Sequence, residues 1–211
     1  MNTLQAVKIP DSKFAREITE LVRETESDLL FNHSSRVYLF AATAGKRRGL
    51  KFDDELLYAG AMFHDMGLTK EYRSNDLRFE VDSANAAAEF LRSHNISQQE
   101  IDLVWTSIAL HTTIGIPHFM HPNVALVITG VEMDIVGFKY DEYDKTEIDR
   151  ITALYPRSNN FKEEIIQAFY DGFKDKPATT FGTVNSDVIV DKDPSFKPMN
   201  FCSVIRDSQW T

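Results

Sequence analysis

Cysteine is almost absent from this sequence, because Cys202 is the only one among 211 residues. A chain with one cysteine cannot form an internal disulfide, and this composition is typical of proteins in a reducing compartment. The N-terminal stretch MNTLQAVKIPDSKF lacks a basic flank followed by an apolar segment, and no apolar run approaches the roughly 20 residues of a membrane span. We therefore expect neither secretion nor membrane insertion, and a cytoplasmic location.

Positive charge is also scarce, with 23 Lys and Arg against 32 Asp and Glu and a formal net charge of -9 at pH 7. This balance opposes broad attraction to nucleic acid or anionic lipid, so we expect a small-molecule substrate and neither a nucleic-acid nor a membrane partner. Hydrophobic residues make up 43% of the sequence, enough for a chain of this length to bury one core. We predict a single domain over residues 1–211; whether it forms a homo-oligomer stays open.

Apolar residues recur at helical spacing along most of the chain, as at Phe14, Ile18 and Leu21. The clearest helix start signal is SQQE, a capping box in which the side chains of Ser97 and Glu100 satisfy free backbone donors. The predicted fold class is therefore all-α. Helices are predicted from about Ser12, over a stripe from Leu30 to Ala44, from Asp53 or Asp54 until Gly67, from Ser83, from Ser97, from Pro122, over 145–155 and over 161–173.

After Lys176 the composition changes, because Pro, Asn, Asp and Thr become frequent and only the stretch DVIV resembles a short strand. The segment nevertheless keeps several aromatic residues, which a disordered tail usually lacks. We predict a helical bundle with its core over residues 25–175 and an extended C-terminal segment, 177–211, wrapped over it. Loops are predicted at 68–81 and 113–123.

Four ionisable residues interrupt helix faces that are otherwise apolar, namely His33, His64, Asp65 and Asp134. Burying a carboxylate is costly unless something neutralises it, and a divalent cation would do so with neutral imidazoles as further ligands. Nitrogen and oxygen donors without thiolates suit Zn²⁺, Fe²⁺ or Mn²⁺ and disfavour Ca²⁺. If each of these residues is considered alone, its position on an apolar face can also be explained without a metal, as that of a hydrogen-bonded side chain in the core.

The order of these residues resembles a known family. His33, then the pair HD at 64 and 65, then Asp134, each on a helix, is similar to the HD-domain superfamily of metal-dependent hydrolases. The stretches FNHSSRVYLF, AMFHDMGLT, RFEVDSANAAAEFL and TGVEMD resemble its cyanamide hydratase branch, whose fungal members hydrate cyanamide to urea at a zinc ion. The resemblance covers roughly residues 25–175. It implies that His33, His64, Asp65 and Asp134 bind the metal, with Zn²⁺ favoured and Fe²⁺ or Mn²⁺ as alternatives.

A metal held by three or four protein ligands keeps a coordination position for water and lowers the pKa of that water toward neutrality. The resulting hydroxide can attack the electrophilic carbon of cyanamide, a short, neutral and linear molecule, and yield urea. No nucleophilic side chain is required, and the single cysteine argues against a thiol-dependent nitrilase. The predicted function is therefore that of a metal-dependent hydro-lyase acting on a small nitrile.

Other functions of the same superfamily stay open. An HD phosphohydrolase acting on a nucleotide or another phosphate ester would hold phosphate with Arg36, Lys70, Arg73 and Arg78. A dinuclear iron oxygenase would need His111 and either His118 or His121 as extra ligands. A regulatory module without catalysis normally lacks one of the four ligands, and none is missing here.

His111, Lys70 and Asp65 are the predicted catalytic residues. His111 lies near a helix end beside a loop, where it could transfer protons during hydration or simply cap the helix. Lys70 follows the HD pair closely and could orient a substrate or bond to Asp65, whereas an exposed lysine is the alternative. Asp65 belongs to both the metal ligands and the catalytic set.

Thr112, Arg78 and Glu80 are the predicted substrate-binding residues. Thr112 could line the pocket or merely end the helix before it. Arg78 and Glu80 come from RFE, in a predicted loop that could close over a small substrate. The alternative for this pair is an ordinary surface ion pair, which contributes little stability.

Overall fold

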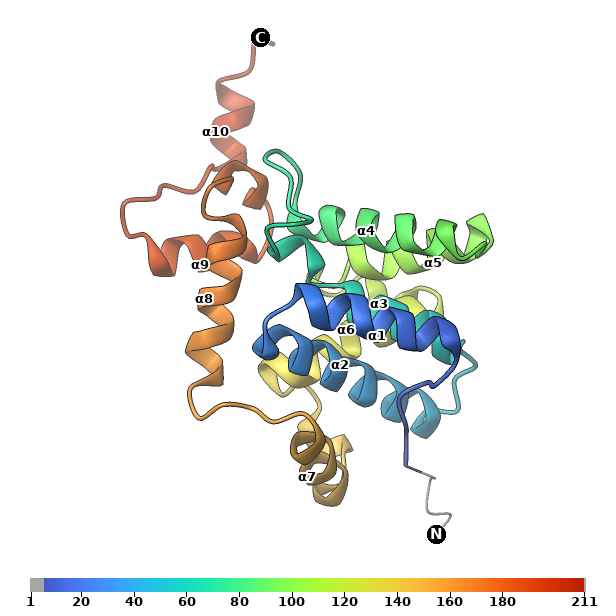
Figure 1. Ribbon diagram of the computed structural model, residues 1–211. Coiled ribbons are helices and arrows are strands. Elements are labelled where there is room, and N and C mark those ends of the chain that lie inside the picture. The colour runs from blue at the N-terminus through green and yellow to red at the C-terminus, as the bar shows by residue number, and fades with distance from the viewer. Residues whose placement is uncertain (1–5, 211) are drawn as a thin grey trace.

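A computed structural model describes residues 6–210, and within that range the chain forms ten α-helices and four short 3-10 helices without a strand (Figure 1). The prediction of an all-α fold is confirmed. No helix in the described range is both long enough and apolar enough to cross a membrane. The α-helices are α1 (Lys13–Thr25), α2 (Asp28–Arg47), α3 (Asp54–Phe63), α4 (Phe79–Ser93), α5 (Gln98–Ala109), α6 (Pro122–Val136), α7 (Lys145–Leu154), α8 (Phe161–Phe173), α9 (Asn185–Lys192) and α10 (Phe201–Arg206). The 3-10 helices are η1 (Met66–Leu68), η2 (Pro117–Phe119), η3 (Tyr140–Glu142) and η4 (Pro177–Thr180).

The centre of the bundle is the pair α2 and α6, which pack along each other. Gly130 of α6 lies so close to α2 that a Cβ atom there would overlap the carbonyl oxygen of Val37, so the approach requires glycine. His33 lies one turn before Val37, and Asp134 lies one turn after Gly130. The close approach therefore brings Asp134 beside His33, and Nδ1 of His33 is 2.6 Å from Oδ2 of Asp134.

The HD pair lies in a turn. α3 ends at Phe63, and His64 and Asp65 connect it to η1, so the prediction that this helix continues until Gly67 is wrong. Gly67 does not close the helix in a left-handed conformation. It lies in η1 against the backbone of α4, where a Cβ atom would not fit, and its N–H donates to Oγ of Ser83 at 2.8 Å. The turn that carries the HD pair is thereby fixed to α4.

The start of α4 also differs from the prediction. The helix begins at Phe79, four residues before the expected start at Ser83, so the predicted loop 68–81 is too long at its end. The boundary was not recognisable because Arg78, at the N-cap position, makes no capping hydrogen bond with its side chain. Glu80 consequently lies in the first helical turn, where it is fully buried. The capping box predicted at Ser97 is confirmed.

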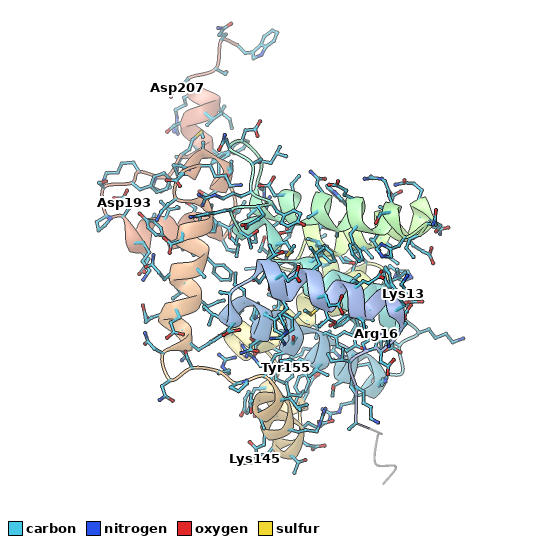
Figure 2. The ribbon with its side chains drawn as sticks, viewed as in Figure 1. Lys13, Arg16, Lys145, Tyr155, Asp193 and Asp207 are labelled. Atoms are coloured by element: carbon cyan, nitrogen blue, oxygen red, sulfur yellow. The ribbon has the colours of Figure 1, made fainter. Side chains whose placement is uncertain are left out.

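The C-terminal segment contains η4, α9 and α10, so the prediction that the whole tail is extended is wrong. The stretch DVIV, expected as a strand, lies within α9. Phe161 and Ile165 of α8 and Ile189 of α9 form a second, smaller core with residues of α2, η1 and α4. In contrast, α10 projects away from the bundle, and Figure 2 shows the side chains near Asp207 pointing into open space. The tail therefore covers the bundle through α9 and as far as Phe196.

Candidate metal centre

Three predicted ligands converge at one buried point. His33 comes from the second turn of α2, whereas His64 and Asp65 come from the turn after α3. Nε2 of His33 lies 3.2 Å from Nε2 of His64, and Oδ2 of Asp65 lies 3.7 Å from the first nitrogen and 3.3 Å from the second. The ligand atoms of the three residues all lie within 4.8 Å of one another.

The hydrogen bonds of the rings fix which nitrogens carry protons. Nδ1 of His33 faces the Asp134 carboxylate, and Nδ1 of His64 faces the carbonyl oxygen of Ala61 at 2.7 Å. Since both partners are acceptors, each Nδ1 must donate, which leaves Nε2 of a neutral ring with an exposed lone pair. Two such lone pairs face each other at 3.2 Å, an arrangement that is repulsive unless a proton or a metal cation lies between them.

The carboxylate of Asp65 supports the same conclusion. Both of its oxygens are buried, and neither has a hydrogen-bond partner. A buried carboxylate without partners is strongly destabilising, whereas coordination of a divalent cation would satisfy it. Two imidazoles and a carboxylate form a donor set that suits Zn²⁺, Fe²⁺ or Mn²⁺. The residues present therefore fit the metal that the sequence predicts, with room for further ligands.

The electrostatics of the centre favour positive charge beside Asp65. Burial alone would raise the pKa of Asp65, but the rings of His64, His33 and His111 outweigh this effect and hold the pKa at about 2. Burial alone would lower the pKa of His64, yet the Asp65 carboxylate outweighs it and raises that pKa. A bound cation would supply the same positive charge while the rings stay neutral.

Asp134 lies outside the group of three ligand atoms that the structure brings together, so its role as a fourth ligand stays a prediction. It faces Nδ1 of His33, on the opposite edge of the ring from the three ligand atoms. Its oxygens also accept from Nε and Nη2 of Arg36, at 2.7 and 2.9 Å, and from Nη1 of Arg157 at 2.9 Å. Burial would raise the pKa of Asp134, but His33 and then Arg36 outweigh it, so that the pKa is lowered. Asp134 is therefore an ionised partner that holds the His33 ring in place, and a partner of this kind raises the basicity of a histidine that binds a metal.

His111 lies directly beside the three ligands. Its Nε2 is 3.8 Å from Oδ1 of Asp65, and its Nδ1 is 2.6 Å from the carbonyl oxygen of Ile108. Burial, followed by the neighbouring His64, lowers the pKa of His111 to about 4, so the ring is neutral at pH 7. With Nδ1 donating to Ile108, Nε2 is an acceptor that faces the centre.

The predicted substrate-binding residues also come together. Glu80 accepts hydrogen bonds from the Arg78 guanidinium at 2.8 Å, from the Thr112 hydroxyl and from Nδ2 of Asn185 at 3.0 Å. Because Glu80 is fully buried, the alternative of a surface ion pair does not apply to it. Asn185 was missed by the sequence analysis, since it lies in the segment predicted to be extended and no pattern marks it.

Other predicted residues lie elsewhere. Lys70 is exposed and does not line the cavity at the centre, so the structure gives it no place in the site. His118 lies at the edge of the cavity, where its Nε2 is 3.0 Å from a carboxylate oxygen of Glu132. His121 is the N-cap of α6 and accepts from the N–H of Asn123. Neither loop histidine joins the ligand group.

A cavity of about 560 Å³ opens onto the centre. Its polar lining is confined to a few groups, whereas most of its wall is apolar, and no Lys or Arg of the described chain lines it. The lining residues are His33, His64, Asp65, Phe79, His111, Thr112, Ile114, Gly115, His118, Ile128, Val131, Glu132, Ile135, Val136, Phe138, Ile166, Phe169, Val184, Asn185 and Val188.

Comparison with known proteins places most of this site within one family. A family model described as HD domain matches residues 30–153, more than half of the chain. The matched range contains His33, His64, Asp65, His111 and Asp134, and it ends before α8. No curated protein matches the chain.

Removal of one ligand should abolish metal binding. His64→Ala deletes one of three ligand atoms, so elemental analysis should find about one metal ion per chain in the wild type and almost none in the variant. His118→Ala is the matched control, because His118 lines the same cavity outside the ligand group, and it should keep its metal. Chelation should lower the Tm of the wild type and of His118→Ala but not that of His64→Ala. Full metal content in His64→Ala would contradict the assignment.

Asp134→Asn should act differently from loss of a ligand. The variant keeps an acceptor for Nδ1 of His33 but removes the charge that pairs with Arg36, so metal affinity should fall about 10–100-fold without loss of binding at saturation. Competition with a chromophoric chelator measures this affinity. A variant that binds no metal even at saturation, while remaining folded by circular dichroism, would show that Asp134 is itself a ligand.

Proposed function

The chain belongs to the HD domain family, whose members are mostly metal-dependent hydrolases, and from that premise we propose a hydratase of small uncharged nitriles. Cyanamide is the simplest such substrate, and urea would be its product. In this reaction water adds across the C≡N bond: a C–O bond forms, one C–N π bond breaks, and the nitrogen gains the proton. The reaction has no leaving group and needs neither oxidant nor reductant.

The observation that carries this proposal is the lack of available positive charge at the cavity. A phosphate ester would require arginine or lysine side chains that converge on the metal centre. Arg36 and Arg157 are bound to Asp134 behind the His33 ring, and Arg78 is bound to Glu80. Within the described chain, the cavity lining contains no cationic side chain. An uncharged substrate is therefore favoured over the phosphate esters of the alternative function.

When bound here, a divalent metal would supply a water of lowered pKa as the nucleophile. The residues of the chain would do the rest. His33, His64 and Asp65 would hold the metal, with Asp134 fixing the ring of His33. Nε2 of His111 is an acceptor that faces the centre, and in this proposal it would take a proton from the attacking water and return one to the nitrile nitrogen.

Substrate turnover tests the proposal directly. The zinc-loaded protein should form urea from cyanamide, with little dependence on ionic strength because an uncharged substrate gains nothing from electrostatic steering. A panel of nucleoside mono- and triphosphates should release no phosphate or nucleoside. The His64→Ala variant controls for contaminating activity. Salt-sensitive phosphate release without urea formation would instead support the phosphohydrolase function.

His111→Ala should separate proton transfer from metal binding. Because His111 is placed beside the ligands without being needed for the three-atom group, the variant should keep its metal and lose about 10²–10⁴-fold in kcat. His94→Ala is a matched control, since His94 caps the far end of α4 and bonds to Glu17. It should keep full activity. Loss of stoichiometric metal from His111→Ala would make His111 a ligand and revive the dinuclear alternative.

A further inference from the structure

One wall of the cavity comes from outside the matched family region. Residues 30–153 carry the metal centre, whereas α8 and α9 follow that range and lie beside the bundle (Figure 1). The part of the cavity lining that these helices and the residue before α9 contribute is Ile166, Phe169, Val184, Asn185 and Val188. All but Asn185 are apolar.

This wall is firmly attached to the HD turn. α8 packs directly on η1, because a Cβ atom at Gly172 would overlap the Leu68 side chain. Beyond α8, Nζ of Lys176 lies 2.6 Å from Oδ2 of Asp82, and both side chains are buried. Removal of one partner from such a buried pair is strongly destabilising, so the contact holds the segment in one position.

A second attachment joins the wall to the polar residues of the site. Asn185, the first residue of α9, donates to the buried Glu80, which also accepts from Thr112. Val188 lies three residues further along α9, within the cavity lining. The apolar wall is therefore held at a fixed place relative to the metal centre.

The size and polarity of the cavity do not match cyanamide alone. Cyanamide has three non-hydrogen atoms, comparable to about three water molecules of roughly 30 Å³ each, whereas the cavity measures about 560 Å³. His33, His64 and Asp65 contribute polar groups at the centre, whereas α8, α9 and the residue before α9 contribute Ile166, Phe169, Val184 and Val188, which are apolar. A ligand that fills it needs a small polar end and a larger apolar body.

We infer that the substrate is a nitrile with an apolar substituent of several carbons, selected by the wall that Ile166, Phe169, Val184 and Val188 form. This inference rests on the proposed function and adds the substrate class. The nitrile end reaches His111 and the metal ligands, and the substituent is buried against α8 and α9. Each methylene buried in this way should raise kcat/KM about fourfold, until the cavity is full.

A homologous series of substrates tests the inference. With zinc-loaded full-length protein, kcat/KM for amide formation should rise from acetonitrile through butyronitrile to hexanenitrile, and all should be compared with cyanamide.

Val188→Trp fills the cavity, so it should lower the ratio of kcat/KM for hexanenitrile to that for cyanamide at least tenfold. Val188→Ser, which needs no extra room, should lower the same ratio by a smaller factor. The matched control is Val190→Trp on the same helix, because Val190 is 44% exposed and does not line the cavity, and it should keep the wild-type ratio.

The failure of the inference can be distinguished from failure of the proposed function. Urea formation from cyanamide with equal or falling kcat/KM along the series would overturn the inference alone. If no nitrile is hydrated, the proposed function fails, and calorimetric titration with hexanamide then decides the inference. Binding that Val188→Trp weakens and Val190→Trp does not would support an apolar-substituent site, whereas no binding would overturn it.

Discussion

The buried carboxylate of Asp65 is the constraint on which the rest of the site depends. Its two oxygens have no hydrogen-bond donor, and the nearest groups are ring nitrogens whose lone pairs face it and each other. Such a cluster is stable only with a positive charge at its centre. The protein builds it at the junction of α2, α3 and η1, where the three side chains are buried and line the cavity.

Charged side chains on the Nδ1 side of His33 hold the ring of this residue in its orientation. Asp134 joins His33 to Arg36 and Arg157, so one carboxylate fixes the tautomer of a metal ligand while two arginines neutralise it. The close approach of Gly130 to Val37 makes the contact possible. Since these arginines are engaged, they are not available to hold an anionic substrate. The engagement of these arginines therefore supports the proposal of an uncharged substrate.

Much of this arrangement could be predicted from the sequence, because it depends on periodicity and local signals. Helical spacing placed His33 on an apolar face, and the capping box at Ser97 marked the start of α5. The role of Asp134 could not be predicted, since its position between His33 and Arg36 depends on how closely α2 and α6 approach. Asn185 was likewise beyond prediction, because a hydrogen bond to Glu80 across 105 residues leaves no local pattern. The composition after Lys176 resembled an extended segment, but tertiary packing made α9 a helix.

The central claim is that one divalent metal ion lies between Nε2 of His33, Nε2 of His64 and the Asp65 carboxylate. Anomalous diffraction from crystals of the zinc-loaded protein, recorded on both sides of the zinc absorption edge, locates the ion directly. The account predicts a single strong peak about 2.0–2.2 Å from these three ligand atoms, with Asp134 still bound to Nδ1 of His33. A peak coordinated by Asp134 in place of Asp65, or zinc bound only elsewhere on the chain, would contradict it.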